Sequence, residues 1–299
     1  MLCDELVNDP VLPGVYGAGW AIVMAKIKKA QKFRLTPEFA ASANGLVDNL
    51  PQLEKVAPWC RTPYPLTWFE FKHTDRPHWD PAGRYGARPI DRSRHQLEPL
   101  ACGFLLEQVE RASRWSTHLF WRAKDPEGVV PKEDSINNGS IARVTFDTER
   151  RGDDLLTAMT EIEMAEFGGE MIDALPLKVA KMLAEYATED WGGEIRYVFA
   201  VLGLMNTRNV VQRELVSKAE HNVKRARRGH HPLFDYHLLK VRPGMVTRAS
   251  GGGPTQHGVR MHFVTGHFKT RRSGVYWWNA HVRGSIEQGF VSKDYELTR

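Results

Sequence analysis

The chain has 299 residues and 42% of them are hydrophobic, which is enough for an apolar core without disulfide or metal cross-links. Its three cysteines are far apart and include no Cys-x-x-Cys pair, which argues against a disulfide framework and against a cysteine zinc site. No apolar run approaches the roughly 18 residues of a membrane-spanning helix, and the acidic residues that follow Met1 are atypical of a signal peptide. We therefore expect a cytoplasmic protein that does not enter a membrane.

The net charge of +5 is unevenly distributed along the chain. Residues 218–299 hold 15 Lys and Arg against 5 Asp and Glu, whereas the first 217 residues hold 26 against 31. Eight of the twelve histidines also lie in this C-terminal part. Such asymmetry predicts an anionic partner, for which nucleic acid is the usual candidate. The alternative is a solvated basic surface that docks on the acidic part of the same chain.

The first predicted elements are two helices, followed by strands. Residues 16–33 have an apolar face and basic residues near their C-terminal end, and a second helix runs to about residue 50 from the N-cap Thr36. Alternating hydrophobic segments then predict strands at residues 66–71, 100–107, 117–123 and 141–147. Turn signals at residues 125–128 and 137–139 separate the later strands, which indicates an antiparallel meander.

From Asp154 onward the apolar period changes to that of a helix, and helices are predicted within residues 154–217. This part is acidic, since residues 147–194 contain 13 acidic and 4 basic residues. The run of carboxylates at Glu161, Glu163, Glu166 and Glu170 is interpreted as a solvated helix face, because no histidine lies near it in the sequence to complete a metal site. Residues 198–205 are apolar on all sides and predict a buried helix.

A short basic cluster follows, with four cations within five positions. Lys224, Arg225, Arg227 and Arg228 cover more than half of the circumference of a helix, so at least two of them must face solvent. Such a cluster suits contacts with phosphates, which position a nucleic acid without reading its sequence. Residues 232–241 then predict a strand that places Asp235 and His237 on one face, either as a hydrogen-bonded pair or with His237 as an ordinary buried histidine.

Two further strands are predicted at residues 258–264 and 275–283. If these strands pair, Arg260 and His262 on the first lie near His281 and Arg283 on the second, and Trp277 shares the face of the latter two. His262 and His281 could then serve as general acid and base, while the two arginines stabilise the charge of a phosphodiester undergoing cleavage. The alternative is an ordinary sheet face on which these side chains pack against aromatic residues.

No metal or other cofactor is expected in this region. A zinc site formed by the four neighbouring histidines, His257, His262, His267 and His281, is disfavoured by strand parity and by the absence of a nearby cysteine. The predicted loop between the two strands carries Lys269, Arg271 and Arg272 beside Trp277. Charge next to stacking surface is the combination that single-stranded nucleic acid uses.

The same residues resemble a family of proteins encoded by bacteriophages and prophages. The likeness rests on the order of Pro-Leu-Phe-Asp-Tyr-His from Pro232, His-Phe-Val-x-Gly-His-Phe-Lys from His262, Tyr-Trp at Tyr276, Ala-His-Val-Arg-Gly from Ala280 and Lys-Asp-Tyr-x-Leu from Lys293. It covers mainly residues 218–299. The resemblance implies a phage or mobile-element protein in the cytoplasm of a bacterial host, with packaging in virions left open, and it implies no particular activity.

The sequence therefore predicts an α+β fold. An antiparallel sheet, built from strands in residues 66–147 and 233–297, should pack against the helical segment 154–217. The chain divides into a net acidic part, residues 1–217, and a basic, histidine-rich part, residues 218–299, which shares its core. The leading function is contact with single-stranded or non-specific nucleic acid through the basic part. The alternatives are a metal-independent nuclease and a factor that binds a host or phage protein.

Overall fold

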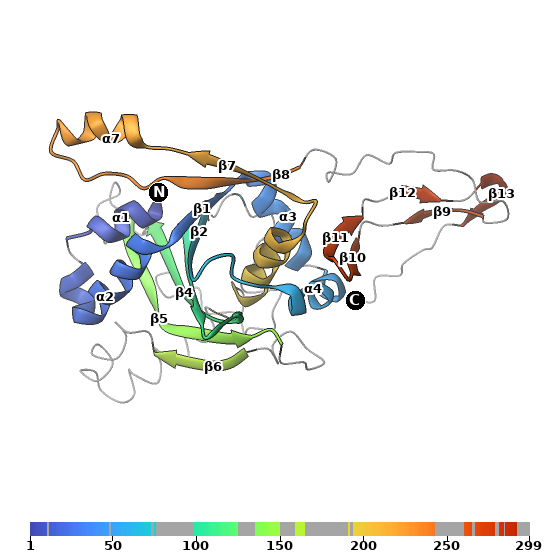
Figure 1. Ribbon diagram of the computed structural model, residues 1–299, viewed down its shortest axis with the longest axis horizontal. Helices are drawn as coiled ribbons and strands as arrows, with labels where there is room; N and C mark the ends of the chain where they lie inside the picture. The colour runs from blue at the N-terminus through green and yellow to red at the C-terminus, as the bar shows by residue number, and fades with distance from the viewer. Residues whose placement is uncertain are drawn as a thin grey trace.

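The computed structural model confirms the α+β class, with a mostly antiparallel sheet as its main element (Figure 1). It describes residues 1–10, 12–47, 49–72, 75, 98–124, 135–149, 159–164, 191, 194–242, 260–264, 267–278, 281–283 and 285–291. The helices are α1 (Leu2–Asn8), α2 (Leu12–Lys29), α3 (Pro37–Val47), α4 (Leu50–Val56), the short 3-10 helix η1 (Ala57–Trp59), a helix at residues 194–206 that we call the central helix, and α7 (Ala219–Ala226).

The main sheet has eight strands in the order β6-β5-β4-β3-β2-β1-β8-β7. The strands are β1 (Gln31–Leu35), β2 (Leu66–Lys72), β3 (Glu98–Val109), β4 (Arg111–Lys124), β5 (Ser135–Asp147), β6 (Met159–Met164), β7 (Val211–Val216) and β8 (Tyr236–Val241). Strand β1 is parallel to both of its neighbours, and the other pairs are antiparallel. The predicted meander of residues 66–147 is confirmed as β2 to β5.

Helices cover both faces of this sheet. On one face α1 and α2 contribute to a core with Trp20, Trp68 and Phe120, while on the other the central helix, α3 and α4 pack on Phe69 and Phe104. The central helix is apolar on nearly all sides, and its side chains from Tyr197 to Leu202 are fully buried, as its sequence predicted. Because the helix is buried on all sides, its sequence shows a continuous apolar run and no amphipathic period.

The first predicted helix ends earlier than expected, because strand β1 follows it directly. Helix α2 stops at Lys29, and Lys32 already belongs to β1. The buried Lys32 Nζ donates hydrogen bonds to the carbonyl oxygens of Ile27, Lys28 and Ala30, at 2.8, 2.9 and 2.7 Å. A cation at these carbonyls satisfies acceptors that a helix leaves free at its C-terminus, and the burial that this position requires lowers the pKa of Lys32.

The prediction of a helix over residues 154–164 is wrong for the part that the structure describes. Residues 159–164 form strand β6, which pairs with β5 so that Ile162 lies opposite Val144 and Glu163 opposite Arg143. A short segment of apolar and acidic residues fits the helical and the strand period equally well. Here the edge of β5 offers backbone hydrogen bonds, and the segment forms a strand. The predicted turn at residues 137–139 is also wrong, because these residues lie inside β5, opposite Arg122, Trp121 and Phe120. The turn at 125–128 and the helix at 171–186 lie outside the described residues.

Of the C-terminal strands, only β8 joins the main sheet. The others form two small sheets: a hairpin of β10 (His267–Arg271) and β11 (Gly274–Trp278), and a three-stranded sheet in the order β12-β9-β13. Its strands are β9 (Arg260–Val264), β12 (His281–Arg283) and β13 (Ser285–Val291). The single strand predicted at residues 275–283 is therefore two strands, β11 and β12, which belong to different sheets.

A buried carboxyl group in the core predicts a dependence of stability on pH. Glu70 accepts hydrogen bonds from Trp68 Nε1 and from the backbone N–H of Cys3, at 3.0 and 3.2 Å. Burial raises the pKa of Glu70 above its ordinary value of 4.5, although the nearby amino terminus and these hydrogen bonds act in the opposite direction. Above pH 4.5 the folded protein therefore retains a proton that the unfolded chain releases, and stability falls as pH rises through that window.

The variant Glu70→Gln keeps an acceptor for Trp68 but has no proton to lose, so its stability should vary less between pH 4.5 and the raised pKa. Thermal unfolding followed at several pH values measures this. If stability changed equally with pH in the wild type and in Glu70→Gln, the raised pKa could not belong to Glu70.

Candidate nucleic-acid interface

The β10–β11 hairpin has one buried face and one exposed face. Its register pairs His267 with Trp278, Phe268 with Trp277 and Lys269 with Tyr276, and Gly274 closes the turn with φ of 128°, in a region that favours glycine. Phe268 and Val275 point into the main core, and Trp277 packs edge-on against Phe268 with ring centroids 4.9 Å apart. The same alternation places His267, Lys269, Arg271, Tyr276 and Trp278 on the outer face.

The outer face centres on an exposed tryptophan with two cations beside its ring. Trp278 is 38% exposed, Lys269 Nζ lies 4.1 Å from its ring centroid, and the Arg271 guanidinium lies 5.7 Å away. The His267 ring is 6.4 Å from the same indole. These distances fit cation–π contacts, which hold the cations beside the ring and leave indole surface open to solvent. We call His267, Lys269, Arg271 and Trp278 the hairpin surface.

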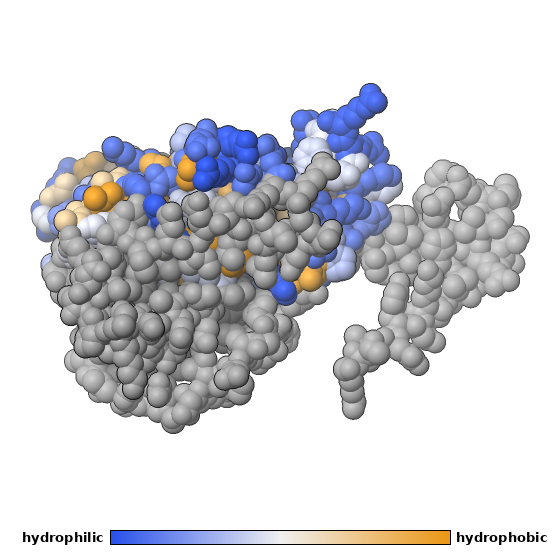
Figure 2. Space-filling view, turned by 90° about the horizontal axis from the view of Figure 1, so that it is seen from below, coloured by the Kyte–Doolittle hydropathy of each residue, from blue (hydrophilic) through white to orange (hydrophobic). Residues whose placement is uncertain are grey.

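Tyr276 and Arg208 extend the hairpin surface. The Ser273 and Tyr276 hydroxyl groups are 3.1 Å apart. This hydrogen bond, followed by the charges of Arg208 and Arg271, lowers the pKa of the Tyr276 phenol. Arg208 and Arg271 therefore lie near the phenol and add to the positive charge of the hairpin surface. In the space-filling view the described residues at this end of the molecule are mostly hydrophilic (Figure 2).

Two amide side chains attach the hairpin to the rest of the protein. Asn209, just after the central helix, donates from Nδ2 to the Trp277 carbonyl at 2.8 Å and accepts from the Trp277 N–H at 2.9 Å. Gln52 of α4 accepts from the Phe268 N–H at 2.9 Å. The Arg208 N–H also donates to the Val275 carbonyl at 3.2 Å. These bonds fix the hairpin against the start of the segment that leads into β7.

Helix α7 carries the second cluster of cations, and it projects from the turn between β7 and β8 (Figure 1). No residue of α7 is buried. Asn222 holds the helix against the returning chain, since its amide both donates to the Leu233 carbonyl and accepts from the Leu233 N–H, each at 2.8 Å. Gly229, with φ of 70°, ends the turn that follows the helix, where a side chain would strain the backbone.

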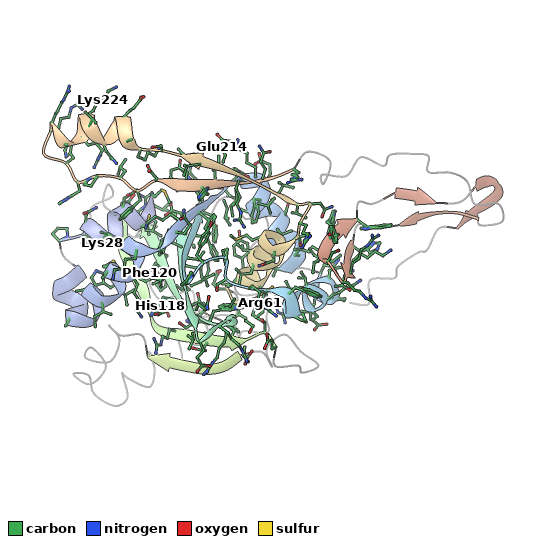
Figure 3. All side chains as sticks on the ribbon, viewed as in Figure 1. Lys28, Arg61, His118, Phe120, Glu214 and Lys224 are labelled. Atoms are coloured by element: carbon green, nitrogen blue, oxygen red, sulfur yellow. The ribbon has the colours of Figure 1, made fainter. Side chains whose placement is uncertain are left out.

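The cations of α7 are available to a partner. Lys224, Arg227 and Arg228 are exposed, and none of them forms an ion pair with any group in the described part of the chain. Arg225 differs, because its Nε donates to the His231 carbonyl at 2.8 Å and helps to close the turn. Lys224 stands at the top of the molecule in Figure 3. We call Lys218, Lys224, Arg225, Arg227 and Arg228 the α7 surface.

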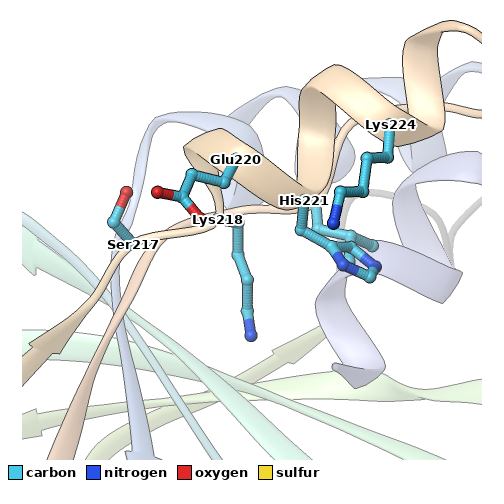
Figure 4. A pocket seen from close by; sticks show the side chains of 6 residues that line it. Ser217, Lys218, Glu220, His221 and Lys224 are labelled. Atoms are coloured by element: carbon cyan, nitrogen blue, oxygen red, sulfur yellow. The ribbon is translucent and has the colours of Figure 1, made fainter.

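A shallow pocket of about 270 Å³ lies beside the first turns of α7. It is lined by Ser217, Lys218, Glu220, His221, Lys224 and Leu233. The side chains of His221 and Lys224 point to the same side of the helix, next to each other (Figure 4). The pocket offers cationic and imidazole N–H donors of the kind that phosphate oxygens accept.

The two adjacent tryptophans of β11 differ in exposure. Trp277 was expected to offer stacking surface, but it packs against Phe268, and its neighbour Trp278 is the exposed indole. Lys269, Arg271 and Arg272 are exposed beside it, as are the predicted cations of α7 apart from the half-buried Arg225. Asp235 and His237 do not pair, since Asp235 accepts from the Lys218 N–H and His237 stacks on Phe33 at 5.5 Å.

The four residues of the predicted phosphodiesterase site lie in strands whose side chains are outside the described set. The backbone register of β9 and β12 places Arg283 opposite His262 and His281 opposite Val264. Positions opposite each other in an antiparallel pair, and positions two apart in one strand, belong to one face. Arg260, His262, His281 and Arg283 therefore occupy positions on one face of this small sheet.

Comparisons with protein-family models, with curated proteins and with solved structures gave no match to this chain. Within the described residues, no group of three or more His, Cys, Asp or Glu side chains is arranged to hold a metal ion. Among the helices that the structure describes, none is long and apolar enough to span a membrane. The two basic surfaces are therefore the described features that bear most directly on function.

Proposed function

We propose that this protein binds nucleic acid, with the hairpin surface stacking on an unpaired base and the α7 surface contacting phosphates. The observation that carries the proposal is the exposed Trp278, with Lys269 and Arg271 beside it at 4.1 and 5.7 Å from its ring centroid. A base has a π-face that can lie on an indole, and its phosphate accepts from a neighbouring cation. The resemblance to phage and prophage proteins makes DNA or RNA in a bacterial cell the natural partner.

Two features support unpaired rather than duplex nucleic acid. An exposed indole contributes stacking energy only where the base is not already stacked within a helix. The second feature is that Lys269 and Arg271 lie beside the Trp278 ring, where they can contact the phosphates that flank a base stacked on the indole. The proposed binding is accordingly independent of sequence.

Replacing Trp278 by alanine tests the proposal. Loss of one stacked base should weaken binding of a fluorescein-labelled single strand about 10-fold, as measured by fluorescence anisotropy. Trp59→Ala is a matched control, because Trp59 is 39% exposed, close to the 38% of Trp278, and no described Lys or Arg stacks on its ring. If wild-type protein binds neither DNA nor RNA at low salt, the proposed function is wrong.

The register of β9 and β12 favours a second candidate, a metal-independent nuclease. His262 and Arg283 lie at opposite positions, and His281 and Arg260 lie two positions from them on the same face. A pair of imidazoles beside arginines could move protons and stabilise charge during phosphodiester cleavage. A single-stranded substrate should then be cleaved in the presence of a chelator, and His262→Ala and His281→Ala should each abolish cleavage. An intact substrate with wild-type protein would exclude this candidate.

A further inference from the structure

The hairpin surface and the α7 surface are joined by a single structural element. Strand β7 begins at Val211, two residues after Asn209, and both Asn209 and the preceding Arg208 hydrogen-bond to β11. It ends at Val216, two residues before the Lys218 that precedes α7. The β7–β8 ribbon therefore runs from one basic surface to the other, and Figure 1 shows it along the upper side of the molecule.

The ribbon is exposed along its outer strand. Strand β7 is an edge of the main sheet, and the four side chains from Gln212 to Leu215 are all exposed. Glu214, visible between α7 and the hairpin in Figure 3, forms an ion pair with Lys240 of β8. Arg213 lies on the opposite face of the strand, with its guanidinium 5.6 Å from the Phe33 ring centroid. Long side chains thus flank this edge from both faces.

Cations also lie between the two basic surfaces. Residues 208–242 contain nine Lys and Arg against three Asp and Glu; six of the nine belong to the two surfaces, and Arg213, Lys240 and Arg242 lie on or beside the β7–β8 ribbon. Two of the three carboxylates are already engaged, Glu214 with Lys240 and Asp235 with the Lys218 N–H. A polyanion that leaves one basic surface along β7 therefore meets further cations before it reaches the other.

We infer that the hairpin surface, the β7 edge and the α7 surface form one continuous track for a single segment of single-stranded nucleic acid. This inference rests on the proposed function and adds the path and the length of the ligand. The six residues of β7 span about 20 Å and the eight of α7 about 12 Å. At about 3.4 Å per phosphate in a stacked strand, the β7 edge and the α7 surface together accommodate about nine nucleotides, and the hairpin surface adds the base stacked on Trp278. Affinity should therefore rise with oligonucleotide length and level off near that size.

Gln212 gives the sharpest test, because it lies on β7 between the two surfaces and belongs to neither. Its side chain is neutral and exposed, so a substitution removes no packing. Gln212→Lys should strengthen, and Gln212→Glu should weaken, the binding of an oligothymidylate of about 12 nucleotides, which is too short for two proteins, each about 5-fold near 0.1 M salt, as expected for one phosphate contact. Gln212→Ala is the neutral control and should bind as the wild type does.

A second measurement separates one track from two independent sites. If the three parts form one track, one wild-type protein binds one oligothymidylate. Replacing Lys224, Arg227 and Arg228 together by alanine should then weaken that same binding event. Arg225 is left unchanged because it closes the turn after α7. Titration calorimetry gives the stoichiometry. Two oligonucleotides per protein, or no response to the Gln212 substitutions, would overturn the continuous track while leaving nucleic-acid binding intact. Absence of binding at every length would overturn both proposals.

Discussion

Replacing Lys269, Arg271 and Arg272 together by alanine should weaken single-stranded nucleic-acid binding about 100-fold near 0.1 M salt. Each cation that neutralises a phosphate releases a counterion, so each loss reduces the slope of log affinity against log salt by about 0.7 for a single strand. The three residues are exposed, and their removal leaves the buried Phe268 and Val275 of the hairpin in place. Anisotropy titrations at several salt concentrations give both quantities.

The matched control removes three exposed lysines that lie on neither basic surface. Lys28 and Lys29 belong to α2, and Lys72 lies at the end of β2. Their replacement by alanine lowers the net charge by the same amount, so it separates local phosphate contacts from the overall charge of the protein. If both triple variants lose affinity equally, binding depends on net charge and the hairpin surface has no special role.

Gly103→Ala should lower the free energy of unfolding by about 3 kcal/mol, the largest effect that we expect from a single methyl group in this protein. A Cβ atom at Gly103 would lie 2.3 and 2.6 Å from two atoms of the buried Trp68 ring. Glycine on β3 allows that ring to lie across the strand and contact Phe120, with centroids 5.6 Å apart. The added methyl group therefore displaces a large side chain from the core.

A double-mutant cycle identifies the cause of that loss. Combining Gly103→Ala with Trp68→Leu removes the overlapping ring, so the pair should be more stable than the sum of its single effects by about 1 to 3 kcal/mol. Gly45→Ala is the control, because a Cβ in this position of α3 meets nothing within 4 Å. It should raise stability by about 0.5 to 1 kcal/mol through helix propensity alone. Denaturant unfolding measures all four proteins.

The parts of the fold that could be predicted from sequence are those with a strong and uninterrupted pattern. The strands β2 to β4 alternate clearly, and the central helix is apolar throughout, so both were recognised. Strand β1 was missed because its sequence, Gln31–Leu35, continues the helical period of α2 for another turn. What ends the helix is Lys32, whose hydrogen bonds to three carbonyl groups are a tertiary arrangement that no local pattern signals.

The exposed tryptophan of the hairpin, Trp278, could have been identified from the sequence with a different strand pairing. Adjacent tryptophans must face opposite sides of a strand, so parity alone leaves Trp277 and Trp278 equivalent. The discriminating signal is Phe268, the one apolar side chain in a run of cations, which must face the core and takes its cross-strand partner Trp277 with it. The predicted pairing of residues 275–283 with residues 258–264 instead leaves no place for the two-residue turn at Arg272 and Ser273.

Helix α7 is attached to the rest of the protein by few contacts, which affects its local stability. The helix has no buried residue, and it is held mainly through the Asn222 amide on Leu233 and the Arg225 guanidinium on His231. The hairpin, by contrast, inserts Phe268 and Val275 into the core. Elements with few buried contacts open at a small fraction of the global free energy of unfolding. Helix α7 therefore forms a separate cooperative unit that can unfold and refold while the eight-stranded sheet stays intact.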